Sequence, residues 1–428
     1  MLVHEIDQAD FIALASGRGG AGAIRSLWRG QRSKRLMLLK MVVDRWPEPT
    51  TERDAALAVL LAAERHAPTT VRALIDEPMV GAWAAATVRA LRTSGNDAVR
   101  DRLLGRLGAI VAVAACRAGI DAEVTGSVHR GRLTLPSMGG LARAVPDGTR
   151  VRLTTKAGAL LVDGAEPTEA DGSWQPLRTL SAGATDRFTV VFEDLDPHRD
   201  LFHVRASDRV SLDQFTVWGR EFARTWRLLR QYVPHHVEEL AAGLHSLVPL
   251  TKPDRRAAHS ATALDGVGVI GLDLPASPAD FAAALVHEFQ HSKLTALLDI
   301  TALYQPDAGA TFFAPWRDDP RPIGGLFQGV YAFLGVADTW RALATDPGRF
   351  PQAPTRFAQA RVQVTDAVAT LAGSGLLTAA GTRFTHHLTA AVEALREVPV
   401  ARTVAQEADR LLLDRRARWR GAAGRSTA

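Results

Sequence analysis

The stretch FAAALVHEFQHSKLTALLDI, residues 281–300, follows a run with the signals of a helix start. Ser277 can cap the N-terminus of this helix, and Pro278 suits its first position. Residues 260–275, SATALDGVGVIGLDLP, precede the cap and read as a strand that contains three glycines. The sequence therefore predicts a strand followed by a capped helix, and residues 281–300 form most of that helix.

The helix carries the pattern His-Glu-x-x-His, formed by His287, Glu288 and His291. Residues four apart on a helix share a face, so the two histidines can present their imidazoles to one ion. Glu288 lies beside them and can reach a metal-bound water as a catalytic group. With 13 histidines and 46 acidic residues in the chain, chance gives about 0.04 such patterns. The low chance frequency favours a metal site over an incidental pair of histidines. The predicted strand followed by this helix matches the layout of zincins.

The third metal ligand is harder to place. A catalytic metal needs a third protein ligand and an open position, and in many zincins the ligand is a Glu on the next helix. The next predicted helix, residues 322–343, contains no Glu and no His. Gln328 occupies the expected place and is our first choice, Asp299 is the second, and another residue or a water is the remaining alternative. This departure counts against an ordinary zinc peptidase.

The loop between the two helices, residues 304–322, is rich in Pro and Asp and contains two arginines. Arg317 and Arg321 can each offer a guanidinium fork to a carboxylate of a small cofactor. We favour Arg321, because it lies nearer the second helix. The alternative is a surface loop in which Arg317 pairs with a neighbouring aspartate.

The chain has 428 residues, which predicts two or three domains. Leu- and Ala-rich segments predict a helical N-terminal region over 1–118, and alternating branched and polar residues predict a β-rich segment over 119–200. Residues 201–428 then form the metal-binding catalytic domain. The expected fold class is α+β, mainly helical, with a β-rich middle segment and a zincin-like core of a strand and the HExxH helix.

Charge and composition exclude several classes of function. The formal net charge of +5 is small for this length, and no dense Lys/Arg tract alternates with aromatics, so we expect no nucleic-acid partner. No apolar run approaches the ~20 residues that span a bilayer, and the N-terminus lacks the order of a signal peptide. Cys116 is the single cysteine, so no disulfide forms within the chain. These features fit a cytoplasmic protein.

Three further features receive structural interpretations. The glycine-rich segment SGRGGAG, residues 16–22, predicts a mobile turn between helices, with a lid or peptide-contacting segment as the alternative. The adjacent His235 and His236 point in different directions on a helix, and we expect surface or core histidines. Lys293, two residues past the motif, is expected on another, solvated face.

The motif and its surroundings resemble a known family. HEFQHSKL at 287–294, then APWRDDPRPIGGLFQGVYAFLGVA at 314–337, look like HExxH proteins encoded beside ribosomally made, post-translationally modified peptides. The opening FIALASGRGGAGAIRSLWRGQRSKRL at 11–36 is similar to their N-terminus, so the resemblance covers the whole chain. Members are understood as 2-oxoglutarate-dependent β-hydroxylases of precursor-peptide side chains, and they often accompany radical SAM maturases.

The resemblance implies iron(II) held by His287 and His291, with 2-oxoglutarate as co-substrate. Many relatives place His or Gln at the position of Gln328, and Arg321 in an R-P-x-x-G pattern would suit the 2-oxoglutarate carboxylate. The implied partners are a ribosomal precursor peptide and a radical SAM maturase of the same pathway. Two alternatives stay open: a zinc metallopeptidase with Glu288 as general base, and a non-catalytic, metal-stabilised peptide-binding scaffold.

Overall fold

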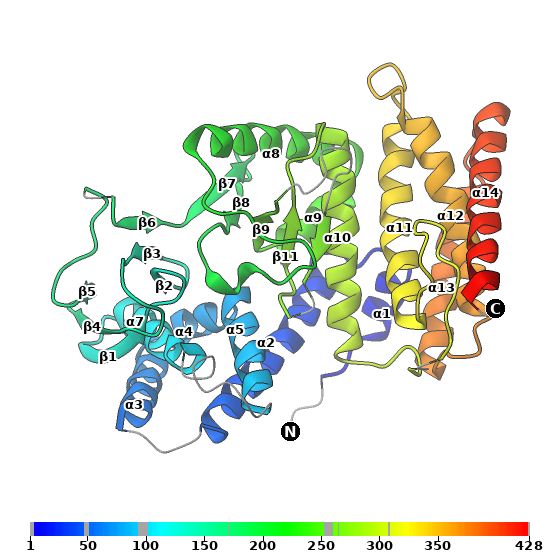
Figure 1. The fold of residues 1–428 in the computed structure, drawn as a ribbon. Coiled ribbons are helices and arrows are strands. Elements are labelled where there is room, and N and C mark those ends of the chain that lie inside the picture. Colours follow the sequence, from blue (N-terminus) through cyan, green and yellow to red (C-terminus); the bar gives the residue numbers. More distant parts are fainter. Residues whose placement is uncertain are drawn as a thin grey trace.

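The fold is α+β and mainly helical, as the sequence predicts. The computed structural model describes residues 4–46, 51–92, 102–170, 172–251, 260–263, 265–306 and 309–426. Figure 1 shows a region of short strands and helices at one side and long, roughly parallel helices at the other. Helix α10, which carries the HExxH motif, stands between them.

Within the described residues, the helices lie in two groups along the chain, one before β1 and one after β8, with three further strands between α9 and α10. The first group is α1 Gln8–Ala15, α2 Gly20–Asp44, α3 Thr51–His66, α4 Pro68–Ile75, α5 Pro78–Arg92 and α7 Arg106–Ala118. The second group is α8 Leu212–Tyr232, α9 Pro234–Gly243, α10 Pro278–Leu298, α11 Ile323–Leu343, α12 Ala353–Ala372, α13 Ala379–Arg396 and α14 Arg402–Ser426.

Short strands form three sheets. The strands are β1 Ala122–Ser127, β2 Arg132–Leu135, β3 Gly139–Ala142, β4 Arg150–Lys156, β5 Ala159–Val162, β6 Trp174–Pro176, β7 Arg178–Ala182, β8 Phe188–Phe192, β9 Ser246–Pro249, β10 Ser260–Thr262 and β11 Val269–Leu272. Two sheets have three strands each, in the orders β1-β4-β5 and β2-β3-β6. The third sheet has the order β10-β11-β9-β8-β7.

The five-stranded sheet places an edge strand beside the HExxH helix. Its inner strands β8, β9 and β11 run parallel, and every residue of β9 and β11 is buried, as expected for strands covered on both faces. The segment 260–275 forms two strands and not one, because Gly268 adopts φ +88° and turns the chain. Strand β10 is consequently an edge strand, antiparallel to β11.

Two large hydrophobic cores hold the chain together. One contains buried residues of α1, the start of α2, β7 and β8, and helices α8 to α13. The other contains residues of α3, α4, α5, α7 and strands β1 to β5, together with Val42 near the end of α2. Helix α2 therefore connects both cores. The domain boundaries at residues 118 and 200 stay a prediction.

Helix α10 matches the helix expected from the sequence. The side chain of Ser277 accepts a hydrogen bond from the backbone N–H of Asp280, and Pro278 occupies the first turn. Helix α11 packs against α10, and in Figure 1 α12 and α13 lie on the side of α11 that faces away from α10. None of the helices in the described residues is long and apolar enough to cross a membrane.

Candidate functional site

The two histidines of the HExxH motif face each other on α10. Their Nε2 atoms lie 3.2 Å apart, and the rings are nearly perpendicular. Burial lowers the pKa of His287 to about 4, outweighing the opposite effect of Glu288. A neutral imidazole with a free Nε2 is the form that binds metal ions, so His287 is suited to be a ligand.

This spacing fits a shared metal ion. Two nitrogens that are each about 2.1 Å from an ion lie about 3.0 Å apart at a right angle and about 3.4 Å apart at a tetrahedral angle. The observed 3.2 Å between the Nε2 atoms falls inside that range. Within the described residues, no Cys, Asp, Glu or further His completes a group of three ligands with His287 and His291. The protein therefore supplies two well-placed ligands from the motif alone.

Gln328 lies beside these ligands, on α11. Its Oε1 is 2.9 Å from Nδ1 of His291, and its Nε2 donates to Oγ1 of Thr295 over 3.2 Å. Thr295 thereby fixes the amide so that the carbonyl oxygen accepts from the imidazole. This contact resembles that of a group which orients a metal-binding histidine from its far nitrogen. The structure therefore places the Gln328 side chain against His291, and its expected role as a metal ligand stays a prediction.

Glu288 is held by the edge strand β10. Its Oε1 accepts from Oγ of Ser260 over 2.7 Å, and its Oε2 accepts from Oγ1 of Thr262 over 2.6 Å. Its Oε1 also lies 3.7 Å from Nε2 of His287. The side chain is almost fully buried. Glu288 therefore joins the HExxH helix to the sheet while remaining next to the metal-binding face.

Aromatic side chains form one wall of the site. The ring of Phe333 meets the ring of His287 edge to face at 5.3 Å, and Trp316 stacks on Phe333 at 4.6 Å. Trp316 fits there because residue 329 is a glycine: a Cβ on Gly329 would lie 2.1 Å from the indole ring. The loop between α10 and α11 thus reaches the histidines through an aromatic stack.

The two loop arginines pair with an aspartate of their own loop. Nε of Arg317 donates to Asp319 over 2.7 Å, and NH1 of Arg321 lies 3.4 Å from the same carboxylate. The hydrogen bond from Arg317 lowers the pKa of Asp319 despite the opposing effect of desolvation. Arg321 also packs against Gly325 in the first turn of α11, one turn before Gln328. Their predicted role in binding a cofactor stays a prediction.

The structure gives Asp299 and Lys293 other partners than the sequence suggested. Asp299 accepts from Gln31 and Lys34 of α2, both over 2.8 Å, and does not join the histidines. The expectation of a solvated Lys293 was wrong, because its side chain is 0% exposed and its Nζ lies 2.9 Å from Oε2 of Glu239. Its face of α10 packs on α9 and on the turn after α1, which charge patterning alone does not reveal.

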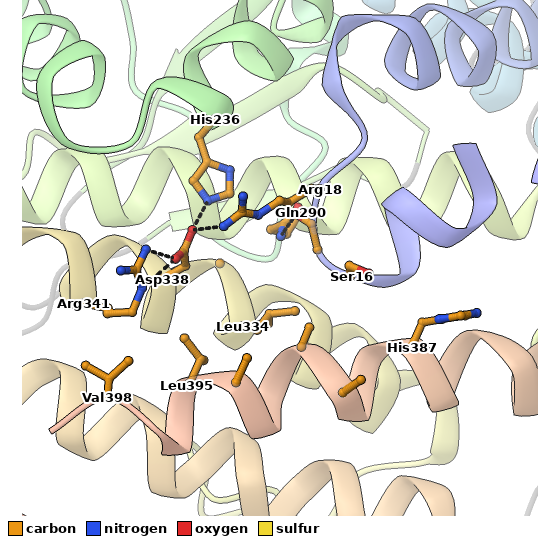
Figure 2. Close-up of a pocket in the computed structure, with 15 residues that line it drawn as sticks. Ser16, Arg18, His236, Gln290, Leu334, Asp338, Arg341, His387, Leu395 and Val398 are labelled. Carbon is orange, nitrogen blue, oxygen red and sulfur yellow. Dashed lines mark hydrogen bonds and ion pairs between the residues drawn. The ribbon is translucent and has the colours of Figure 1, made fainter. Parts of the chain in front are cut away.

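A second polar cluster lies beyond this buried pair. Asp338 of α11 lies 2.7 Å from Nε2 of His235 and 3.6 Å from Nε2 of His236, and the three ligand atoms lie within 4.8 Å of one another. Arg341 binds the other oxygen of Asp338 through two nitrogens, at 3.0 and 2.7 Å. Arg18 approaches Asp338 at 3.9 Å, as Figure 2 shows.

Sequence reasoning missed the importance of this cluster. The expectation that His235 and His236 point in different directions was wrong: their ring centroids lie 4.3 Å apart, and both rings reach the same carboxylate on α11, about 100 residues away in the chain. The only feature of the sequence that points to this cluster is the pair of histidines after Pro234, at the start of a helix. That feature does not indicate which acidic residue the histidines contact.

Comparison with known proteins adds no relative. The chain matches no protein-family model and no curated protein.

Proposed function

We propose that this protein is an iron(II)- and 2-oxoglutarate-dependent hydroxylase that modifies the β-carbon of a side chain in a ribosomally made precursor peptide. The observation that carries the proposal is the pair of facing Nε2 atoms of His287 and His291, without a third acidic or histidine ligand in the described residues. Such oxygenases usually bind iron through two histidines and one carboxylate and leave positions open for a co-substrate and oxygen; this chain departs from that set, and Gln328 is the candidate for the third group. The resemblance of the motif region to HExxH peptide hydroxylases supports the same function.

The position of β10 beside α10 supports a zincin-like core for this site. In such a core an edge strand lies along the metal-binding helix, and here β10 does so through the hydroxyls of Ser260 and Thr262. Those two hydrogen bonds hold Glu288 in the role of a positioning group. Each carboxylate oxygen can accept more than one hydrogen bond, so Glu288 keeps lone pairs with which it could also contact a water beside His287.

The residues around the histidines have separable tasks. His287 and His291 would hold the ion, and Gln328 would keep Nε2 of His291 directed at it. Iron(II) together with 2-oxoglutarate and oxygen supplies the oxidising power that a C–H bond requires. Phe333 and Trp316 would exclude water from the face of His287 and offer an apolar wall to the peptide side chain.

Arg321 and Arg317 are the candidates for the carboxylates of 2-oxoglutarate. Both now bind Asp319, so co-substrate binding requires an exchange of one carboxylate for another. Arg321 is the stronger candidate because it packs on the first turn of α11, close in sequence to Gln328. Asp319→Ala should then free both guanidinium groups and lower the KM for 2-oxoglutarate, whereas Arg321→Ala should raise it.

The decisive experiment combines metal analysis with product analysis. Protein purified without oxygen and loaded with Fe(II) is mixed with 2-oxoglutarate, oxygen and the precursor peptide encoded beside its gene. We expect peptide that is heavier by ~16 Da, as one added oxygen atom requires, and one succinate for each turnover. His287→Ala should abolish both products, and His386→Ala, an exposed histidine on α13, should leave them unchanged. Unmodified peptide from the Fe(II)-loaded protein would refute the proposal.

A zinc metallopeptidase is the second candidate, favoured by the 3.7 Å between Oε1 of Glu288 and Nε2 of His287. A carboxylate at that position can act as general base on a metal-bound water. Zn-loaded protein should then cleave the same peptide, and Glu288→Gln should abolish cleavage while metal remains bound. The masses of the two products differ, so one assay separates the candidates.

Cellular context follows from the same proposal. Iron(II) and a newly made ribosomal peptide are both available in the cytoplasm, where we place the reaction. A radical SAM maturase acting on the same peptide is the partner that the resemblance suggests, and sequential modification of one peptide by both enzymes would test it.

A further inference from the structure

A cavity of about 500 Å³ lies apart from the HExxH histidines, neither of which lines it. It is bounded by the turn Ser16–Arg18, by α11 and by α13, and Gln290 of α10 forms part of its floor. Its size is in the range of pockets that hold small organic ligands. Figure 2 shows Arg18, His236, Asp338 and Arg341 gathered on one side and the apolar side chains of α13 on the other.

Two buried polar atoms at this cavity lack a hydrogen-bond partner within the described residues. They are Nε2 of His236, which lies 3.6 Å from Oδ2 of Asp338, and Oε1 of Gln290, and both side chains are at least nine-tenths buried. Buried polar groups are almost always paired, so both atoms are candidates to contact a ligand. The hydrogen bond of Gln290 Nε2 to the carbonyl of Gly17 fixes the amide, so Oε1 is left as an acceptor. The cavity therefore has room for a ligand that accepts from His236 and donates to Gln290.

The charge of the cavity favours an anion. The charges of Lys293 and Glu239 cancel in their ion pair. Of the remaining charged groups, the single negative charge of Asp338 faces the positive charges of Arg341 and Arg18. Burial would lower the pKa of His236, but Asp338 and Glu239 attract its proton more strongly and raise the pKa. Positive groups thus outnumber negative ones at the cavity. Within the described part of the chain, the side chain of Arg18 has one ionic partner, Asp338 at 3.9 Å, and is 56% exposed.

The same charges argue against a metal ion bound by His235, His236 and Asp338. A cation there would lie beside two arginines, which repel it. In addition, Nε2 of His235 and Oδ2 of Asp338 are 2.7 Å apart, a hydrogen-bond distance shorter than the roughly 3.0–3.4 Å between two ligands of one ion. This cluster is better described as an ion-pair network that positions Asp338 and Arg341.

The turn after α1 is built to present Arg18. The carbonyl of Gly17 accepts from both Gln290 and Lys293, at 2.9 and 3.0 Å. Gly17 has φ +78°, and a Cβ there would lie 2.7 Å from Leu334, so glycine is required. Residues 16–19 therefore form the expected turn between two helices and dock on α10 through Gly17, whereas Gly20 and Gly22 belong to α2. The mobility expected of this turn stays a prediction.

The opposite wall of the cavity is apolar. Its side chains come mainly from α13 and the chain that follows, and they are Ala390, Ala391, Ala394, Leu395 and Val398. Small alanines along one face of α13 leave a shallow space, and Leu395 and Val398 close one end of it. This wall suits an aliphatic side chain.

We propose that this cavity binds a carboxylate adjacent to an amide N–H and an aliphatic side chain, the chemistry shared by the C-terminus of a peptide and by an N-acyl amino acid. The carboxylate accepts from Arg18, Arg341 and Nε2 of His236. The amide N–H donates to Oε1 of Gln290, and the side chain lies on α13. Capture of a terminal carboxylate by clustered donors is a known mode of peptide recognition.

Calorimetric titration with three probes tests each part of the proposal. N-acetylleucine should bind, whereas N-acetylleucinamide, which lacks the carboxylate, should bind at least about tenfold more weakly, because each lost charge-assisted contact is worth about that factor. N-acetyl-N-methylleucine, which lacks the N–H, should also bind more weakly. Equal binding of all three, or no binding of N-acetylleucine, would overturn the proposal.

Variants locate the site and separate it from the metal centre. Arg18→Ala should weaken binding of N-acetylleucine about tenfold, and Arg25→Ala, an exposed arginine on α2, should not change it. N-acetylleucine should still bind to His287→Ala, which disrupts the metal centre. A negative result for this cavity can therefore be told apart from a negative result for the hydroxylase proposal. The double variant His287→Ala, His291→Ala tests for a metal site in this cavity. If it binds Zn²⁺ and loses that binding when His236→Ala is added, the cavity is a metal site and the inference is refuted.

A fourth probe separates the two sources of the ligand. If the site takes a peptide terminus, acetyl-Gly-Ala-Leu should bind at least as well as N-acetylleucine, because a site for a peptide terminus must leave room for the chain that precedes it. If the natural ligand is a small N-acyl amino acid, the longer probe should bind more weakly. Removal of the terminal carboxylate should weaken binding in both cases.

Discussion

Lys293→Met would test the buried ion pair that links the HExxH helix to α9. Methionine keeps the length of the side chain and removes the ammonium, so the change leaves little cavity. Glu239 would lose its contact at 2.9 Å and keep only longer ones, to Nδ1 of His236 at 3.4 Å and to the N–H of Gly20 at 3.3 Å. Removing one partner of a buried pair typically costs about 3–5 kcal/mol, because the other charge stays buried without compensation.

Urea unfolding measures this cost, and Lys34→Met is its matched control. Lys34 also lies 2.8 Å from a carboxylate, that of Asp299, but both side chains are about a third exposed. We expect the control to lower the free energy of unfolding by less than about 1 kcal/mol. Lys293→Met combined with Glu239→Gln should recover much of the loss, because no charge is left unpaired. Equal costs for the two single variants would refute the reasoning.

Three further predictions concern the metal site and the acid stability. Gln328→Ala should lower metal affinity about 10- to 100-fold in a chelator competition, because His291 loses its orienting acceptor, and unchanged affinity would contradict that role. Gly329→Ala should displace Trp316 and lower the free energy of unfolding by about 1–3 kcal/mol, measured in urea; a cost near zero would contradict the close contact. Burial alone would raise the pKa of Glu239, but its cationic partners lower it to about 2. Its contribution, of order 3 kcal/mol, should be present above about pH 4.3 and lost as the pH falls towards 2, so Glu239→Gln should flatten the acid side of the stability profile.

Local patterns were sufficient for the helix that carries the motif. Ser277 and Pro278 set its start, and the spacing of His287 and His291 places both on one face whatever the rest of the chain does. These inferences depend on interactions within one or two turns, so the sequence contains all the information that they need. The mixed α+β character with a majority of helix followed in the same way from periodicity and from glycine and proline positions.

The surroundings of the motif could not be predicted in the same way. Lys293 was expected in solvent, because a charged side chain on an isolated helix has no reason to be buried. Its burial depends on Glu239, which is 54 residues earlier, and on the carbonyl of Gly17, which is 276 residues away. Arg317 and Arg321 were chosen for a cofactor, and the structure pairs both with Asp319, two residues from each.

The sequence by itself determined that two histidines share one face of a helix, because a helix fixes the relative positions of residues four apart. Tertiary structure alone decided what the motif side chains meet: an amide on Nδ1 of His291, two hydroxyls on Glu288 and an aromatic wall beside His287. It also created the charged cavity between Arg18 and α13. These contacts join residues far apart in the chain, and their geometry depends on how helices and strands pack, which no local pattern records.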